Sequence, residues 1–238
     1  MSKQYTKPIS IIMVAWKREE FTKRSIWAIK NNTHYPYRLT VIVNESGEPF
    51  RRNLADNWVY LKKNWGLEPA KNLGMNFVKS RLFVSTDNDI LPMKPNEKGC
   101  WLTQLVELMK KYPNYAAISS RTQVMIGTED IFGGKEEQDI VEFPHPGGSL
   151  RIMRTKPVRQ IGWRKEVKLR GAEERWIGSS LRNKGWKTGF ATKVKSYHLF
   201  GDDENWGYGD MKPQEHGHQP VWHPALKGDD LEELKNYE

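Results

Sequence analysis

Short apolar runs alternate with longer amphipathic stretches along the first part of the chain. Apolar runs of about four to eight residues are typical of buried strands, and apolar positions spaced three and four apart are typical of helices. The pattern predicts strands at residues 10–15, 39–43, 59–61 and 81–85, and helices at residues 19–31 and 69–79. Because helices separate most of these strands, we predict an α/β fold with a mixed, mostly parallel central sheet flanked by helices.

The second part of the chain carries weaker patterns of the same kinds. They predict strands at residues 116–119, 149–154 and 189–194, and helices at residues 101–111, 173–184 and 229–237. Residues 128–146 are rich in Gly, Pro and acidic side chains, which is typical of a long loop. We expect residues 201–223 to be mostly irregular.

Short, mostly polar segments follow three of the predicted strands. They are Ala15-Trp16-Lys17, Asn44-Glu45-Ser46 and Asp87-Asn88-Asp89. In α/β sheets, ligands bind beyond the carboxyl ends of the strands. The sequence therefore predicts a site where these segments meet.

Asp87 and Asp89 are the first candidates for chemistry at that site. Carboxylate oxygens are the ligands that Mg²⁺ and Mn²⁺ prefer, and such ions also bind phosphate oxygens. An isolated Asp-x-Asp is more often a solvated turn. Its position directly after an apolar strand favours the metal interpretation.

Three further candidates have a structural and a functional interpretation each. Lys71 lies in a segment rich in Gly and Asn, which is either an ordinary helix start or a loop that approaches a nucleotide. Glu173 and Glu174 open a predicted helix, where an acid is either a cap or a general base. His198 is either structural or a metal ligand beside Asp89.

Composition narrows the partners and the compartment. The formal net charge is +9, from 38 basic and 29 acidic residues, which favours a polyanionic partner such as nucleotide phosphates, nucleic acid or an anionic membrane face. The strongest apolar run, residues 9–16, is much shorter than the roughly 20 residues of a membrane span, and charged residues follow it, unlike in a signal peptide. With Cys100 as the only cysteine, we expect a cytoplasmic protein.

Five segments together resemble one family. They are SIIMVAWKREEFTKRSI at 10–26, VIVNESG at 41–47, NWGLEPAKNLGMNFVKSRLFVSTDNDILP at 64–92, GGSLRIMRTKPVRQIGW at 147–163 and GAEERWIGSSLRNKGWKTGF at 171–190. Their order and spacing are similar to those of inverting glycosyltransferases with the GT-A fold, of the family-two type. The resemblance covers most of residues 9–200 and implies a Rossmann-like nucleotide-binding sheet.

The resemblance also implies roles for single residues. Ala15, Trp16, Asn44, Glu45 and Lys71 would line the nucleotide pocket. Asp87 would face the ribose or the metal, Asp89 and His198 would bind Mn²⁺ or Mg²⁺, and Glu174 would be the catalytic base with Glu173 before it. Three departures matter: Asn44-Glu45 replaces the usual acidic turn, Lys71 replaces an arginine, and Glu-Glu replaces Glu-Asp.

We therefore predict a metal-dependent glycosyltransferase that uses a UDP- or GDP-sugar and inverts the anomeric centre. A glycan acceptor is favoured over a hydroxylated DNA base. A nucleotidyltransferase on a related fold and a non-catalytic module for nucleic acid or anionic glycans stay as alternatives. The resemblance implies a single domain over residues 1–238, with a nucleotide-binding half at about 1–95, an acceptor half at about 96–200 and an extension at 201–238.

Overall fold

The computed structural model describes residues 7–45, 52–123, 135, 137–164 and 172–199. The expected helix at 229–237, the irregular segment at 201–223 and residues 128–134 and 136 of the loop expected at 128–146 fall outside these ranges. The strands are β1 Ile9–Ala15, β2 Tyr37–Asn44, β3 Asn57–Leu61, β4 Leu82–Asp87, β5 Ile90–Pro92, β6 Tyr115–Gln123, β7 Ile140–Glu142, β8 Leu150–Arg154 and β9 Lys187–His198. The α-helices are α1 Glu19–Asn32, α2 Leu67–Gly74, α3 Trp101–Lys111, α5 Thr155–Ile161 and α6 Ala172–Arg182, and 3-10 turns cover Arg52–Leu54 and Met75–Phe77.

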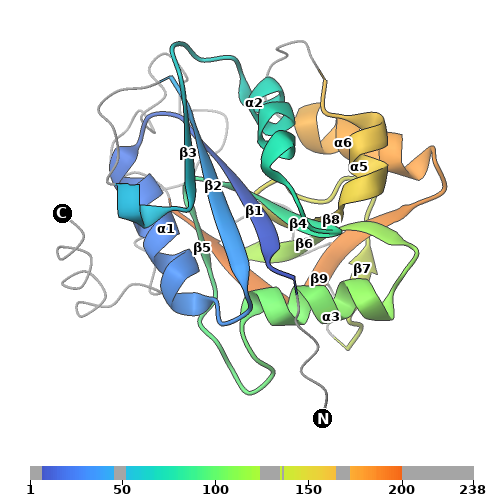
Figure 1. Cartoon of the computed structure of the whole chain (residues 1–238). Helices are drawn as coiled ribbons and strands as arrows, with labels where there is room; N and C mark the ends of the chain where they lie inside the picture. The colour runs from blue at the N-terminus through green and yellow to red at the C-terminus, as the bar shows by residue number, and fades with distance from the viewer. Residues whose placement is uncertain (1–6, 46–51, 124–134, 136, 165–171, 200–238) are drawn as a thin grey trace, which may run out of the picture.

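All described strands join one sheet, in the order β3-β2-β1-β4-β8-β6-β9-β5, with β7 paired to β9. The first four strands in this order are parallel, as the alternation of strands and helices predicted. Beyond β4 the sheet is mixed, because β8 is antiparallel to both β4 and β6. The carboxyl ends of β1, β2 and β4 therefore lie along one edge of the sheet (Figure 1).

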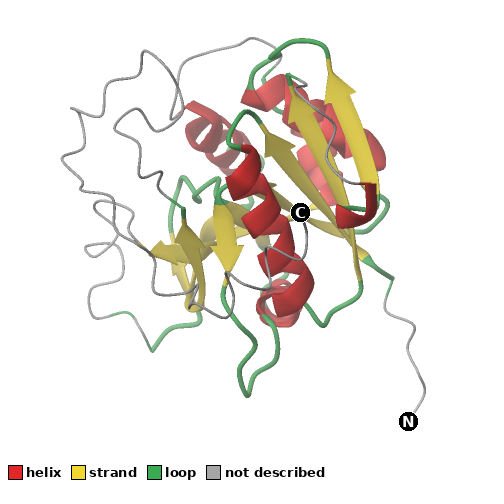
Figure 2. Cartoon of the chain, turned by 90° about the vertical axis from the view of Figure 1, so that its left-hand side faces the viewer, coloured by secondary structure: helices red, strands yellow, loops and turns green. Residues whose placement is uncertain are grey.

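Helices cover both faces of the sheet (Figures 1 and 2). In β1, Ile11 and Met13 pack with α1 and α3, while the alternate positions Ile12 and Val14 pack with α2, α5 and α6. Successive side chains of a strand point to opposite faces, so a strand covered on both sides is apolar at every position. Every residue of β1 is buried accordingly.

The structure corrects several predicted elements. The helix expected at 69–79 begins at Leu67 and changes to a 3-10 turn at Met75. The earlier start places Pro69 in the first helical turn, where a residue needs no partner for its amide. Strand β7 lies inside the predicted loop at 128–146, and the sequence did not indicate α5 or β5. Strands β5 and β7 are each three residues long, which is too short for a periodic pattern in the sequence.

Candidate functional site

The Asp-Asn-Asp turn connects β4 to β5 at the carboxyl edge of the parallel strands. Asp87 is the last residue of β4, and its amide donates to the carbonyl oxygen of Ser149 at 3.0 Å. The hydroxyl of Thr86 donates to the same oxygen. The segment that leads into β8 is thereby fixed beside the first aspartate of the turn.

Lys71, on α2, has no exposed side-chain surface and lies between two carboxylates. Its Nζ is 3.7 Å from Oδ1 of Asp87 and 3.4 Å from Oε1 of Glu173. It thus connects the end of β4 to the first turn of α6. The structure gives Lys71 this bridging place, whereas the sequence alone indicated a side chain available to the base or the phosphates of a nucleotide.

Glu173 is buried and held by three partners. Oε1 accepts hydrogen bonds from Arg151 Nη2 and Trp163 Nε1, both at 2.5 Å, in addition to the ion pair with Lys71. Burial by itself raises the pKa of Glu173. The positive charges of Arg151 and Lys71 and the two hydrogen bonds outweigh burial and lower the pKa to about 2. Glu173 therefore stays ionised and committed to its partners.

Glu174 occupies the next position of α6 and has a different environment. Its side chain is half-buried, and no described donor or cation contacts its carboxylate. A Cβ on Gly148 would lie 2.8 Å from Oε1 of Glu174 and 2.9 Å from Oε2 of Glu173. The glycine before β8 therefore gives both glutamates the room to lie at this edge.

The charges at this edge are close enough to influence one another. Burial raises the pKa of Asp87 to about 7, and the positive charge of Lys71 opposes this rise. The negative charges of Glu173 and Glu174 add to it, as does that of Asp89. Three predicted segments, at β4, α2 and α6, thus converge on one acidic site.

Asp89 pairs with two basic side chains. Arg18 Nη1 is 2.9 Å from Oδ2, and His198 Nε2 is 3.5 Å from Oδ1. The backbone of Asp89 is fixed to the end of β9, because the amide of Leu199 donates to its carbonyl oxygen at 2.7 Å. The predicted neighbourhood of Asp89 and His198 is therefore present, and Arg18 is an additional member.

The candidate nucleotide residues lie at the ends of β1 and β2. Trp16 Nε1 donates to Oε2 of Glu45 at 2.7 Å, next to the buried Ala15. Asn44 is buried and holds the loop before α2, because its amide donates to Asn64 Oδ1 and its Oδ1 accepts from the backbone amide of Trp65, both at 2.8 Å. Asn44 thus orders the loop from inside.

The sequence of this chain matches a known protein family. Residues 10–166 match the family model described as Glycosyl transferase family 2. The chain belongs to glycosyl transferase family 2. A comparison with curated protein sequences gives no match.

Solved structures with similar folds confirm the GT-A α/β architecture of this family 2 chain. GalNAc-T7, solved with UDP, GalNAc and Mn²⁺, has a TM-score of 0.64 and 12% identity over 82% of this chain and 44% of its own. The mannosyltransferase PcManGT from Pyrobaculum calidifontis, solved with GDP-Man and Mn²⁺, has a TM-score of 0.66 and 15% identity over 83% of this chain and 58% of its own. S. aureus TarS 1–349 has a TM-score of 0.61 and 13% identity over 81% of this chain and 60% of its own. The family 2 chain therefore spans about half the length of these proteins.

The residues of the family 2 site fit a divalent cation. Oδ1 of Asp87 is buried and accepts no hydrogen bond from the described residues, which leaves a hard oxygen ligand available. The described chain holds no ready-made group of three or more His, Cys, Asp or Glu ligands. The reason is visible in the contacts: Arg18 covers one oxygen of Asp89, and Asp87 faces Lys71.

Sequence patterns missed several members of the family 2 site. Arg151 and Trp163 bind Glu173, but Arg151 lies in an ordinary predicted strand and Trp163 lies outside every predicted helix and strand. Asn88 donates to the carbonyl oxygen of Lys17, so the middle residue of the Asp-Asn-Asp turn is structural. The one available signal was Arg151, a charged residue between the apolar Leu150 and Ile152 of the predicted strand.

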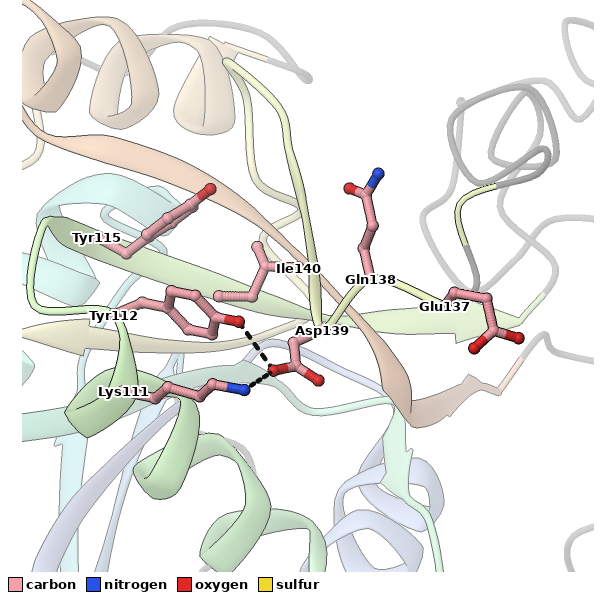
Figure 3. Close-up of a pocket in the computed structure, with 7 residues that line it drawn as sticks. All are labelled: Lys111, Tyr112, Tyr115, Glu137, Gln138, Asp139 and Ile140. Atoms are coloured by element: carbon pink, nitrogen blue, oxygen red, sulfur yellow. Dashed lines mark hydrogen bonds and ion pairs between the residues drawn. The ribbon is translucent and has the colours of Figure 1, made fainter.

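A pocket lies away from the acidic site. Figure 3 shows a pocket of about 450 Å³ where α3 ends and β6 and β7 begin, with Asp139 bonded to Lys111 and Tyr112. Since β6 runs in the same direction as β4, the start of β6 lies at the opposite edge of the sheet from the Asp-Asn-Asp turn.

No helix in the described ranges combines the length and apolarity that crossing a membrane requires.

Proposed function

We propose that this family 2 domain transfers a sugar from a nucleoside-diphosphate sugar to an acceptor hydroxyl, with inversion at the anomeric carbon. Glu174 takes the proton of the acceptor hydroxyl as its oxygen bonds to the anomeric carbon. The bond from that carbon to the diphosphate breaks, and its electron pair leaves with the nucleoside diphosphate. One displacement of this kind inverts the configuration.

The contrast between the two glutamates carries the choice of base. Glu173 is 5% exposed and already accepts from Arg151 and Trp163, so it has little capacity for a substrate proton. Glu174 is half-buried and free of described partners. A general base must reach the proton that it abstracts, and only the second glutamate satisfies this requirement.

The carboxyl edge of β1, β2 and β4 supports the donor side of the proposal. Trp16 and Glu45 offer an aromatic face and a carboxylate for the nucleoside. Asp87, Asp89 and His198 would hold Mn²⁺ or Mg²⁺, which when bound neutralises charge on the diphosphate. The similar structures solved with GDP-Man or UDP and Mn²⁺ support a UDP- or GDP-sugar as donor.

The first experiment is a screen of UDP- and GDP-sugars with Mn²⁺ for slow hydrolysis, using the full chain. We expect release of the nucleoside diphosphate and no pyrophosphate, which a nucleotidyltransferase would produce. Glycan acceptors are tested first, and single-stranded DNA containing hydroxymethylated bases second. Hydrolysis that does not depend on Mn²⁺, or no turnover with any donor, would contradict the proposal.

Variants at the proposed base sharpen this test. Glu174→Gln should lower kcat by about 10²- to 10⁴-fold, the usual contribution of a general base, with donor affinity unchanged. Glu107→Gln is the matched control, because Glu107 is an exposed helical glutamate on α3 that pairs with Lys110. If Glu174→Gln kept the activity of the control, a different group would be the base.

A further inference from the structure

Arg18 forms a buried ion pair with an aspartate that the proposed function assigns to the metal. Its Nη1 is 2.9 Å from Oδ2 of Asp89, and the two side chains are only 5% and 6% exposed. The guanidinium also lies 5.5 Å from the ring centre of Phe21. A surface ion pair contributes little, but a pair with this burial and geometry fixes both side chains.

The backbone before α1 is shaped to place this side chain. Lys17 and Arg18 both have φ of 52°, a left-handed conformation that costs about 1–2 kcal/mol for a residue with a side chain. Such strain persists only where the surroundings hold it. Asn88 Nδ2 donates to the Lys17 carbonyl oxygen, and the amide and hydroxyl of Thr22 donate to that of Arg18. The Asp-Asn-Asp turn therefore fixes the strained segment that aims Arg18 at Asp89.

Each aspartate of the turn has its own cation. Arg18 pairs with Asp89, and Lys71 lies 3.7 Å from Asp87. A divalent ion bound alone would bring positive charge beside both cations and would compete with Arg18 for Oδ2. A divalent ion bound together with a diphosphate adds the negative charge that balances it.

We propose that Arg18 makes the binding of metal and nucleotide interdependent. Arg18 holds Asp89 until the donor arrives, and then releases it to the metal and binds the diphosphate. A guanidinium suits this exchange because its planar donors bind carboxylate and phosphate oxygens equally well. This inference rests on the proposed function, and it makes Arg18 a donor-binding residue that also positions Asp89.

The test measures Mn²⁺ binding by the full chain, without sugar donor, from the electron paramagnetic resonance signal of free Mn²⁺. Titrations are run with Mn²⁺ alone and with UDP or GDP present. In the wild-type chain, nucleotide should tighten Mn²⁺ binding. In Arg18→Gln, Mn²⁺ alone should bind about tenfold tighter, equivalent to about 1.4 kcal/mol, and the enhancement by nucleotide should shrink.

Two further variants make the result specific. Arg24→Gln is the matched control, because Arg24 is on the same helix and pairs with Glu20 at the surface. Arg18→Lys keeps the charge and the packing volume, so Mn²⁺ alone should bind only about two- to threefold tighter than in the wild-type chain.

Unchanged or weaker binding of Mn²⁺ alone by both Arg18 variants would overturn the inference. Asp89→Asn separates this failure from failure of the proposed function. If Asp89→Asn weakens Mn²⁺ binding while the Arg18 variants match the control, the metal site stands and the role of Arg18 falls. If Asp89→Asn has no effect, the metal site itself is wrong.

Discussion

Removing the charge of Glu173 should destabilise the protein far more than removing that of Glu174. In Glu173→Gln, the side chain keeps its shape, but Lys71 and Arg151 lose the carboxylate that compensates them. Both cations are fully buried. Breaking a buried ion pair by removing one partner costs about 3–5 kcal/mol. Glu174 is half-buried and has no ion-pair partner among the described residues, so Glu174→Gln should change the unfolding free energy by less than about 0.5 kcal/mol.

Urea unfolding of the wild-type chain and the two variants, followed by tryptophan fluorescence, measures this difference. The expected result is a lower midpoint for Glu173→Gln at an unchanged slope, and a midpoint close to wild type for Glu174→Gln. When both variants are folded, Glu174→Gln should have the lower activity of the two. Equal stability of the two variants would refute the structural role assigned to Glu173.

The same carboxylate predicts a pH dependence with a definite sign. Because the pKa of Glu173 is about 2 in the folded protein and the ordinary value is 4.5, ionisation of this group stabilises the fold. This contribution is complete above about pH 4.5 and is lost as the pH falls through that range towards 2. The part of the difference in unfolding free energy between wild type and Glu173→Gln that comes from ionisation of Glu173 should therefore shrink below pH 4.5. A difference that grows on acidification would contradict the assignment.

Two glycine substitutions test the packing around α6. In Gly148→Ala, the new Cβ would meet both glutamates below 3.0 Å, so kcat should fall at least about tenfold while the unfolding free energy changes by less than about 2 kcal/mol. In Gly178→Ala, the Cβ would lie 2.2 Å from the carbonyl oxygen of Pro144, so thermal unfolding should show a loss of about 1–3 kcal/mol or more. Gly185→Ala is its control: φ is +82° but nothing lies within 4 Å, so the cost should stay near 1 kcal/mol.

The parallel half of the fold could be predicted from sequence because local pattern and tertiary environment agree there. β1 and β2 are covered on both faces, so their apolar runs are continuous, and α1 and α3 lie close to their predicted ranges. The turn after β4 could be placed for the same reason. The interior residues of β4 are buried, and the strand ends in polar side chains at the sheet edge.

Glu173, Glu174 and His198 of the mixed half were candidates from the sequence, but the partners that bury Glu173 could not be predicted. β8 lies between β4 and β6 in the sheet, and Arg151 is fully buried there, which the sequence of the predicted strand at 149–154 does not indicate. Its partner Glu173 is 22 positions away, and Lys71 meets Glu173 across a still larger separation. Local spacing contains no signal for such pairs, since only the fold brings them together.

Arg18 was overlooked for a related reason. It stands in the run Lys17 to Glu20, where charged residues before a helix are typical of a solvated helix start. Glu19 and Glu20 do behave this way, because they pair along α1 with Lys23 and Arg24. The strained backbone at Arg18 turns this one side chain inward, and the sequence offers no glycine that would have marked the strain.

The charge pattern of the whole site favours Glu174 as its reactive group. The half-buried carboxylate of Asp87 faces Lys71, and the buried carboxylate of Asp89 faces Arg18. The buried carboxylate of Glu173 faces both Lys71 and Arg151. For Glu173, the cations and hydrogen bonds lower the pKa to about 2 and make it a weak base. Glu174 alone among these acids has no such partner in the described chain. Its Oε1 lies beside Gly148 at the same edge of the sheet, where it is available to accept the proton of an acceptor hydroxyl.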